Sequence, residues 1–573
     1  MKSTQSSESP GRAVLDKLGV AEDPLVGSDP VAFLRALGAA GAALVKKPTG
    51  TAAASARLLL GSAAAVRAAA GRAVGLHPAG PTSHEDGDKR FRDPAYEENP
   101  LYFLLEQQFL LGSKLVTELL DAAELEASKD AKARFAAQFV LDALAPTNTF
   151  LGNPAALHEA FETGGKSIAR GAKNMLSDIR HNGGWPSQVD DSDFEVRVNL
   201  AATPGSVVYR NQLIELIQYE PQVKSVHAVP LLFCPPWINK YYIMDLAPGK
   251  SLIEWAIQHG HTCFAISYRN PDSSLRNLGF EDYLRQGPLD AVRVVREITG
   301  APQVNTLPVC LGGTLMAIGL AHNAAIGDDS IKSATLLNTH TDFSVPGALG
   351  VFTDEPTIAG LEKQMAKHGY LEADKMAHTF DALRANDLVF SYVVNNWLLG
   401  KKPPAFDLLV WNKDSTRMPA KMHSEYLRAC YLKNKFARGE FEVDGRKLDP
   451  ASVKIDTYVL SAVDDHIVPW VSGYKTTQLL GGHNPYVLSN SGHIAGIVPP
   501  RPQVQALDQR GQPPDGPPGV EGRGQAARRT WWEDWAKWIA KQGGPKVDAP
   551  DQLGSADYPP IEAAPGSYVR THA

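Results

Sequence analysis

A cysteine followed by two glycines closes an apolar run near the middle of the chain. Residues 307–314 read LPVCLGGT, and a helix is predicted directly after them over 315–321. A strand that turns sharply into a helix projects the side chain at the turn above the edge of a sheet. The positive end of the helix dipole stabilises negative charge there. Cys310 is therefore a candidate nucleophile, and the backbone N–H of Leu311 is a candidate oxyanion donor.

Short apolar runs alternate with helical segments around this turn. Strands are predicted at 229–234, 263–267, 304–309 and 334–337, with helices at 251–259, 283–299 and 315–321. An antiparallel set is predicted before them over 194–200, 207–209 and 213–219, and two later strands at 454–460 and 486–489. The alternation is typical of an α/β fold with a mainly parallel sheet and helices on both faces.

With 573 residues, the chain is long enough for more than one domain. We predict a flexible Ala/Gly-rich tail over 1–94, because alanine offers little apolar area to bury. Attachment of this tail to an apolar particle is the alternative. A helical accessory domain is predicted over 95–190, with helices at 131–144 and 155–179, and a catalytic domain over 191–573.

Within the catalytic domain, the strand–helix alternation is interrupted by a helix-rich insertion over about 345–450, which is the usual place for a lid. Residues 498–527 are dense in Pro, Gly, Gln and Arg, which indicates a flexible loop. A last helix over 530–539 carries four tryptophans at a spacing that suits docking onto the domain.

Two later segments provide a candidate acid and a candidate base. Residues 458–470 read YVLSAVDDHIVPW, so that a strand ends in an acidic pair containing Asp465. Residues 488–496 read LSNSGHIAG and place His493 in a glycine-flanked loop after the next strand. The order nucleophile, acid, base is that of α/β-hydrolases. Cys310, Asp465 and His493 therefore form a candidate catalytic triad.

Composition excludes several other classes of protein. A net charge of −6 gives no general attraction to nucleic acid. Four cysteines without a CxxC pair predict neither a disulfide framework nor a metal site, and they fit a reducing cytoplasm. We expect no signal peptide and no transmembrane segment, because the N-terminus is polar and no apolar run approaches about 18 residues.

The three segments resemble those of polyhydroxyalkanoate synthases, in which the elbow reads GxCxGG, the acid lies in DHIVPW and the base in GHIAG. Residues 235–246, 268–272, 383–388, 406–412 and 565–569 resemble further segments of that family. The resemblance covers about 95–573. One position departs from it, because Pro308 stands where the family elbow has its first glycine.

The resemblance implies an α/β-hydrolase fold and an acyltransferase that polymerises (R)-3-hydroxyacyl groups from coenzyme A thioesters through an acyl group on Cys310. It further implies oxyanion donors at Leu311 and near Ile238 and a substrate contact at Arg384. The coenzyme A thioester is the substrate, and no cofactor is expected. The accessory domain favours the single-subunit type, a homodimer on polyester granules in the cytoplasm.

Two other interpretations remain open from the sequence. One is a cysteine-dependent thioesterase or esterase of the same fold, which would release a free acid instead of a polymer. The other is a catalytically silent scaffold on granules, which Pro308 in the elbow leaves possible.

Overall fold

The computed structural model describes residues 30–85, 87–498, 504–507, 526–527 and 530–572. The chain divides into two compact units. The helical unit comprises Met1–Asp190 and His378–Pro404, and the sheet unit comprises Asp191–Ala377 and Ala405–Ala573. Among the described residues, no helix combines the length and the apolar character that crossing a membrane requires.

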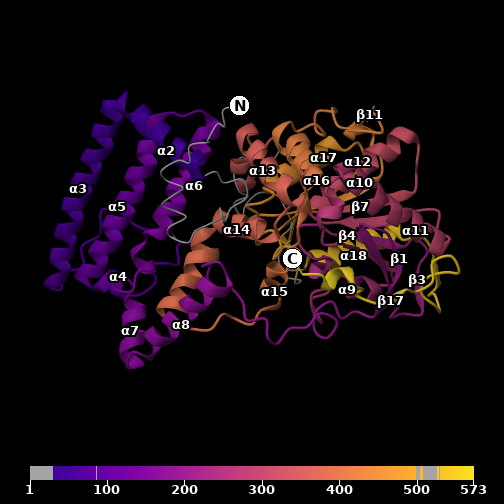
Figure 1. The fold of residues 1–573 in the computed structure, drawn as a ribbon, viewed down its shortest axis with the longest axis horizontal. Coiled ribbons are helices and arrows are strands. Elements are labelled where there is room, and N and C mark those ends of the chain that lie inside the picture. The colour runs from indigo at the N-terminus through magenta and orange to yellow at the C-terminus, as the bar shows by residue number, and fades with distance from the viewer. Residues whose placement is uncertain (1–29, 86, 499–503, 508–525, 528–529, 573) are drawn as a thin grey trace, which may run out of the picture. The chain divides into compact units, whose positions relative to one another are not determined.

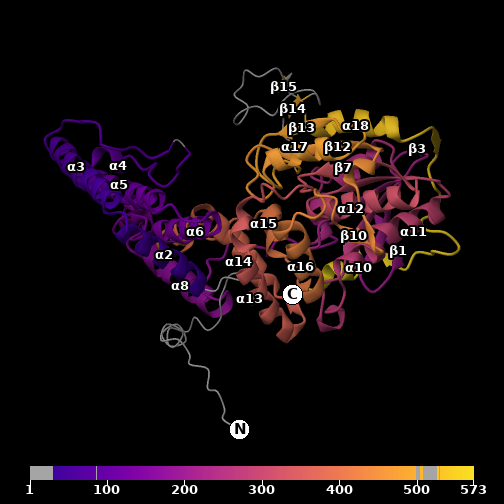
Figure 2. The ribbon, with the colours of Figure 1, turned by 90° about the horizontal axis from the view of Figure 1, so that it is seen from above.

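In the helical unit, helices pack against one another. They are α2 (Pro30–Val45), α3 (Pro48–Ala73), α4 (Ala95–Glu98), α5 (Pro100–Ala123), α6 (Ala127–Ala143), α7 (Pro154–Glu162) and α8 (Lys166–His181). α3 lies along α5, and α2 lies along α6 (Figures 1 and 2). Pro100 at the first turn of α5 and the Asn99 side chain, which accepts from the Leu101 amide, fix the start of the central helix.

The prediction of a flexible tail over residues 1–94 is wrong for the described part of that stretch. α3 packs on α5 through fully buried alanines such as Ala54 and Ala65. At Gly61 a Cβ atom would lie 2.7 Å from the Leu111 side chain, so small residues let the two helices approach closely. The guanidinium of Arg72 lies 3.5 Å above the Phe103 ring and adds a cation–π contact. The close approach of α3 and α5 therefore stabilises their packing, although each alanine buries little apolar area.

The single helix predicted over 155–179 is in fact two helices. α7 ends at Glu162 and α8 begins at Lys166. Between them, Gly164 and Gly165 have φ of 57° and 81°, a left-handed conformation that interrupts a helix and that glycine adopts without steric cost.

Part of the predicted lid belongs to the helical unit. The π-helical segments η6 (Asn386–Phe390) and η7 (Val393–Leu398) pack on α6 and α8. The Trp397 indole donates to Asp178 at 2.7 Å, and a Cβ at Gly171 would lie 1.9 Å from the Trp397 carbonyl oxygen. These contacts join two segments that are more than 200 residues apart, which the sequence pattern did not indicate.

The sheet unit is built on a sheet of eleven strands in the order β15-β14-β13-β12-β7-β6-β4-β5-β2-β1-β17. The strands are β1 (Gly205–Arg210), β2 (Ile214–Tyr219), β4 (Leu231–Cys234), β5 (Cys263–Tyr268), β6 (Val304–Pro308), β7 (Ile331–Leu337), β12 (Asp456–Ala462), β13 (Tyr486–Ser489), β14 (Val504–Leu507), β15 (Ala526–Ala527) and β17 (Glu562–Ala563). From β5 to β13 all neighbours are parallel, and both flanks are antiparallel. The predicted mainly parallel α/β sheet is confirmed.

Helices connect and cover the strands (Figure 1). They include α9 (Leu252–Gln258), α10 (Phe280–Leu284), α11 (Asp290–Thr299), α12 (Leu311–Ile326), α17 (Trp470–Leu479) and α18 (Trp531–Gln542). Residues 194–200, predicted as a strand, contain one isolated bridge between Val196 and Leu200 instead. Most of the loop predicted over 498–527 lies outside the described residues.

The tryptophan-rich helix α18 docks onto the sheet as predicted. Trp531, Trp532 and Trp535 are almost fully buried in the main core cluster. The indole N–H of Trp535 donates to the Thr335 hydroxyl of β7 at 2.9 Å, so its polar atom is satisfied where the ring is buried.

The insertion between β7 and β12 is rich in helices. Its elements in the sheet unit are α13 (Glu355–His368), α15 (Asp407–Lys413), α16 (Ala420–Tyr426) and the π-helical segment η8 (Leu427–Leu432). The first part of α14 (Ala373–Leu383) belongs to the sheet unit, and the part from His378 belongs to the helical unit.

Candidate active site

Cys310 lies at a sharp turn between β6, a central strand of the sheet, and α12. Its φ of 51° and ψ of −119° are a conformation that non-glycine residues rarely adopt. The Cys310 amide donates to the Leu337 carbonyl of β7 at 2.9 Å, which holds the turn at the end of the sheet. The Cys310 side chain is half-buried. Strain of this kind marks functional sites when the surrounding structure maintains it.

Two glycines allow the helix after the turn to approach the sheet. A Cβ at Gly312 would lie 2.3 Å from the Cys234 carbonyl oxygen, and one at Gly313 would lie 1.9 Å from the Thr339 hydroxyl. Neither position accommodates a side chain without a shift of its neighbours. The GG pair of the sequence is therefore a packing requirement of the turn.

The candidate acid and base follow neighbouring parallel strands, β12 and β13. The Nδ1 atom of His493 lies 2.6 Å from Oδ2 of Asp465, whose side chain is fully buried. The other carboxylate oxygen of Asp465 accepts from the amides of Ile467 and Val468, both at 2.9 Å. The acid is thus fixed from both sides and holds the imidazole in one orientation.

His493 contacts both the acid and the thiol. Burial lowers the pKa of His493, but the charges of Asp465 and Cys310 and the side-chain hydrogen bonds to both more than offset it, so that the pKa lies well above its ordinary value. The arrangement favours the protonated form of the imidazole between the two side chains. The structure therefore brings Cys310, Asp465 and His493 together in one hydrogen-bonded chain.

The other three thiols lie in different surroundings. Cys234, Cys263 and Cys430 are buried, and burial raises the pKa of each thiol. A thiol that stays protonated is a poor nucleophile. Among the described residues, Cys310 is the one cysteine that is both partly exposed and next to an imidazole.

The two candidate oxyanion donors are backbone amides of Leu311 and Ile238. Leu311 is the first residue of α12, so its N–H has no acceptor within the helix. Ile238 lies in the loop after β4, and β4 pairs with β6 so that Cys234 is opposite Pro308. The carbonyl oxygen of Pro235 would lie 2.7 Å from a Cβ at Gly312, so this loop begins directly beside the turn.

Pro308 is part of β6, and the strand does not end before it. The amides of Asn305 and Val309 donate toward β4, whereas those of Val304 and Cys310 donate to the Ser330 and Leu337 carbonyls on the β7 side. By this alternation an N–H at position 308 would face β7. The proline therefore removes one hydrogen bond of the ladder, while the turn at Cys310 keeps its conformation.

Arg384 lies in the helical unit, whereas the other candidate residues lie in the sheet unit. Its guanidinium is about half exposed and forms an ion pair with Asp387. Arg384 also lines a cavity of about 120 Å³ within the helical unit, between α6 and the end of α14.

Two supporting residues after β7 were not found from the sequence. The Asn338 side-chain amide donates to the His493 carbonyl. The buried imidazole of His340 contacts the Ile467 carbonyl at 3.0 Å, and burial lowers its pKa to about 4, so it stays neutral. Both follow the C-terminal end of β7, and polar residues at that position of a parallel strand were the available signal.

Two buried tyrosines of the insertion, Tyr426 and Tyr431, are near neighbours of the thiol. Their rings are 5.6 Å apart. Burial raises the pKa of both tyrosines, and the proximity of Cys310 raises it further. Among the described residues, no group of three or more His, Cys, Asp or Glu side chains is arranged to hold a metal ion.

Comparison with known proteins covers both units. The family described as poly-beta-hydroxybutyrate polymerase (PhaC) N-terminus matches residues 87–256, and the family described as alpha/beta hydrolase fold matches residues 229–500. A poly(3-hydroxyalkanoate) polymerase of Methylorubrum extorquens is 43% identical over 493 residues, which cover 85% of this chain and 81% of the relative.

Two further relatives are similar to the same extent. The poly(3-hydroxyalkanoate) polymerase subunit PhaC of Cupriavidus necator is 40% identical over 493 residues, which cover 85% of this chain and 83% of the relative. Poly(3-hydroxyalkanoate) polymerase 1 of Ectopseudomonas oleovorans is 40% identical over 488 residues, which cover 85% and 87%.

Proposed function

Because the chain belongs to the family of poly(3-hydroxyalkanoate) polymerases and is a transferase, we propose that Cys310 carries the acyl chain and that His493 and Asp465 activate the Cys310 thiol. The observation that supports this assignment best is the continuous contact from the half-buried thiol through the buried imidazole to the fully buried carboxylate. The elbow that presents Cys310 supports it as well.

The substrate of the first step is an (R)-3-hydroxyacyl-coenzyme A thioester. The Cys310 thiolate attacks the thioester carbonyl, a new carbon–sulfur bond forms, and the bond to the coenzyme A sulfur breaks. The proton held by His493 passes to the leaving thiolate. Attacking and leaving sulfur are chemically similar, so the exchange is close to isoenergetic. No cofactor takes part in this proposal.

Negative charge forms on the carbonyl oxygen during this step. The N–H of Leu311 at the start of α12 and the N–H of Ile238 in the adjacent loop are the proposed donors. Such preorganised donors typically lower the barrier by about 3–4 kcal/mol each.

Elongation requires an alcohol in place of the thiolate. The 3-hydroxyl of another hydroxyacyl unit loses its proton to His493, supported by Asp465, and attacks the acyl carbon on Cys310. An ester bond forms, and the Cys310 sulfur is released. Water would give a free acid instead, and the buried tyrosines beside the thiol, Tyr426 and Tyr431, help to exclude it. The substrate contact of Arg384 stays a prediction and forms no step of this scheme.

The helical unit supports a second part of the proposal, which is association with polyester granules in the cytoplasm as a homodimer. α8 exposes Ile168, Met175 and Ile179 on one face, since these residues are seven and eleven positions apart. Phe161 of α7 is 88% exposed. Contiguous apolar side chains at a surface are typical of binding sites for apolar partners.

Incubation with (R)-3-hydroxybutyryl-coenzyme A tests the chemistry. We expect release of coenzyme A, insoluble polyester, and an acyl adduct that mass spectrometry locates on Cys310. An adduct on another cysteine would refute the assignment of the nucleophile. Sedimentation and binding to polyester particles test the dimer and the granule, with Ile168→Ser and Ile179→Ser together as the variant that should reduce particle binding.

A further inference from the structure

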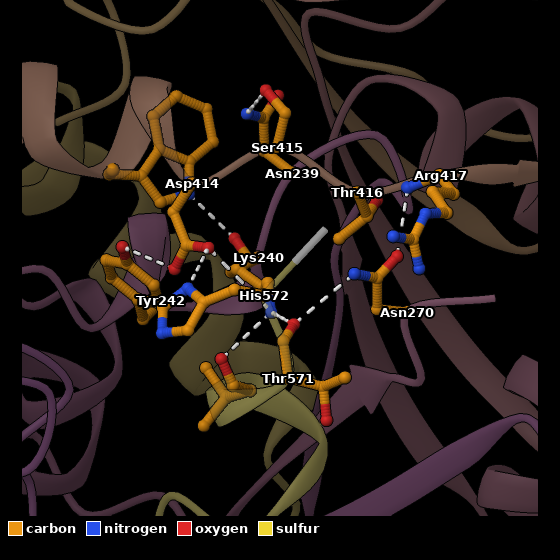
Figure 3. A network of polar contacts seen from close by, with 12 residues as sticks. Asn239, Lys240, Tyr242, Asn270, Asp414, Ser415, Thr416, Arg417, Thr571 and His572 are labelled. Carbon is orange, nitrogen blue, oxygen red and sulfur yellow. Dashed lines mark hydrogen bonds and ion pairs between the residues drawn. The ribbon is translucent and has the colours of Figure 1, made fainter. Parts of the chain in front are cut away.

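A buried lysine lies at the centre of a polar network in the sheet unit (Figure 3). The Lys240 side chain is 1% exposed, and its ammonium donates to the carbonyls of Val569 and Thr571 at 2.9 and 2.6 Å. Its third neighbour is Asp414, at 3.8 Å. A buried charge is maintained only where such partners satisfy it. Lys240 therefore ties the C-terminal segment to the stretch around Asp414.

The stretch after Asp414 contacts the loop that carries Ile238. The Thr416 hydroxyl donates to the Trp237 carbonyl at 2.5 Å and lies 3.0 Å from the Ile238 carbonyl. The Thr416 amide donates to the Ile238 carbonyl at 2.9 Å. Thr416 is 3% exposed, so these contacts are shielded from water.

The contact with Trp237 determines the direction of an N–H group. The carbonyl of Trp237 and the N–H of Ile238 belong to one planar peptide unit and point in opposite directions. A hydroxyl that holds the carbonyl on one side therefore fixes the N–H on the other. The same loop begins at Pro235, beside Gly312 of the nucleophile turn.

We propose that Thr416 is a positioning residue for acyl transfer: its hydroxyl aims the Ile238 N–H, and Lys240 holds Thr416 in place by joining Asp414 to the C-terminal segment. The inference rests on the proposed oxyanion role of Ile238. The inference also assigns a role to the C-terminal segment. The Thr571 carbonyl accepts a hydrogen bond from the Asn270 side-chain amide, and the Asn270 side-chain oxygen accepts one from the Arg417 amide.

The test compares two reactions of Cys310. Acylation by (R)-3-hydroxybutyryl-coenzyme A develops charge on a carbonyl oxygen and needs the oxyanion donors, whereas alkylation by iodoacetamide needs only the thiolate. Thr416→Val removes the hydroxyl at nearly constant volume. We expect single-turnover acylation to slow by roughly 10- to 100-fold, with alkylation almost unchanged. Thr416→Ser restores the hydroxyl and should restore most of the acylation rate.

The matched control is Thr353→Val. Thr353 is 8% exposed, and its hydroxyl donates to the Gly350 carbonyl at 2.9 Å, so the same atoms are removed elsewhere in the sheet unit. It should acylate and alkylate like the wild type. Lys240→Met should show the selective loss of Thr416→Val. Lys240→Met combined with Asp414→Asn removes the carboxylate charge together with the ammonium, and the double variant should fold yet still acylate slowly.

Three outcomes would overturn the inference. The first is acylation of Thr416→Val at the wild-type rate. The second is a parallel fall of alkylation in Thr416→Val, which would mean an effect on the thiol or on the fold. The third is full acylation by the double variant Lys240→Met and Asp414→Asn, which would mean that Lys240 only balances the charge of Asp414. Failure of the proposed function is a separate result, because it shows as wild-type protein whose acyl adduct is not on Cys310.

Discussion

The helical unit buries mostly alanines between its helices, whereas the sheet unit buries large aliphatic and aromatic side chains on its central strands. Burial of a large apolar side chain stabilises a fold by about 1.5–3 kcal/mol, and alanine provides much less. Where the structure describes side chains, most of the large apolar ones that are exposed lie on the helical unit. The proposed chemistry requires a rigid frame around Cys310, and the apolar outer face is the surface proposed to bind polyester.

The largest expected effect tests whether all the chemistry belongs to the sheet unit. Cys310→Ala removes the nucleophile, and coenzyme A release should fall by roughly 10⁴-fold or more. Spectrophotometric detection of the free thiol of coenzyme A measures it. Cys430→Ala is the control, because that thiol is buried and its raised pKa keeps it protonated. An equal loss of coenzyme A release in both variants would contradict the assignment of Cys310 as the nucleophile.

The second effect concerns the acid that holds His493. Asp465→Asn removes a charge that raises the His493 pKa, so the imidazolium loses its proton at lower pH. The pH at which His493 loses its proton, measured from the pH dependence of acylation, should therefore fall, and elongation should slow by about 10²- to 10⁴-fold. The exposed neighbour Asp464 provides the control, as Asp464→Asn. A reversed pattern would move the role to Asp464.

The third effect sharpens the contrast between the cores. Ala65 of α3 and Ala317 of α12 are both fully buried. Leucine at either position should cost about 1–3 kcal/mol through overpacking, measured by calorimetry. Ala317→Leu should also slow acylation, because α12 begins at the nucleophile turn, whereas Ala65→Leu should leave acylation unchanged. Slower acylation in Ala65→Leu would show that the helical unit supports the chemistry directly.

The smallest effect concerns the elbow itself. Pro308→Gly adds an N–H that faces β7 and increases the freedom of the unfolded chain, and the two changes oppose each other. Unfolding free energy should change by no more than about 1 kcal/mol, and acylation should change little, since the turn at Cys310 is already formed in the presence of proline. A large gain in acylation would show that proline distorts the elbow.

The sheet unit was predictable from the sequence because its strands are continuous apolar runs and its candidate residues follow strand ends. Cys310, Asp465 and His493 were identified in this way. Lys240 and Thr416 were not, because their partners lie about 170 to 330 residues away in the chain. Asn338 was missed for a similar reason, since its contact is with the His493 main chain.

The helical unit was less predictable for a different physical reason. Alanine-rich segments such as α3 gave no strong apolar stripe, so composition indicated a flexible tail, although small residues allow close helix packing. The pairing of 378–404 with α6 and α8 depends on contacts such as that of Trp397 with Asp178, which no local pattern reveals.

The tryptophans of α18 make the two units separately observable by optical spectroscopy. Trp531, Trp532 and Trp535 lie in the core of the sheet unit, and the first tryptophan of the chain is Trp185. Helices α2 to α8 therefore contain no indole fluorophore, and the helical unit contributes two of the ten tryptophans, Trp185 and Trp397. These helices contribute strongly to the far-ultraviolet circular dichroism. Intrinsic fluorescence reports mainly on the sheet unit during unfolding, and a dichroism transition that precedes it would be a direct record of the helical unit melting first.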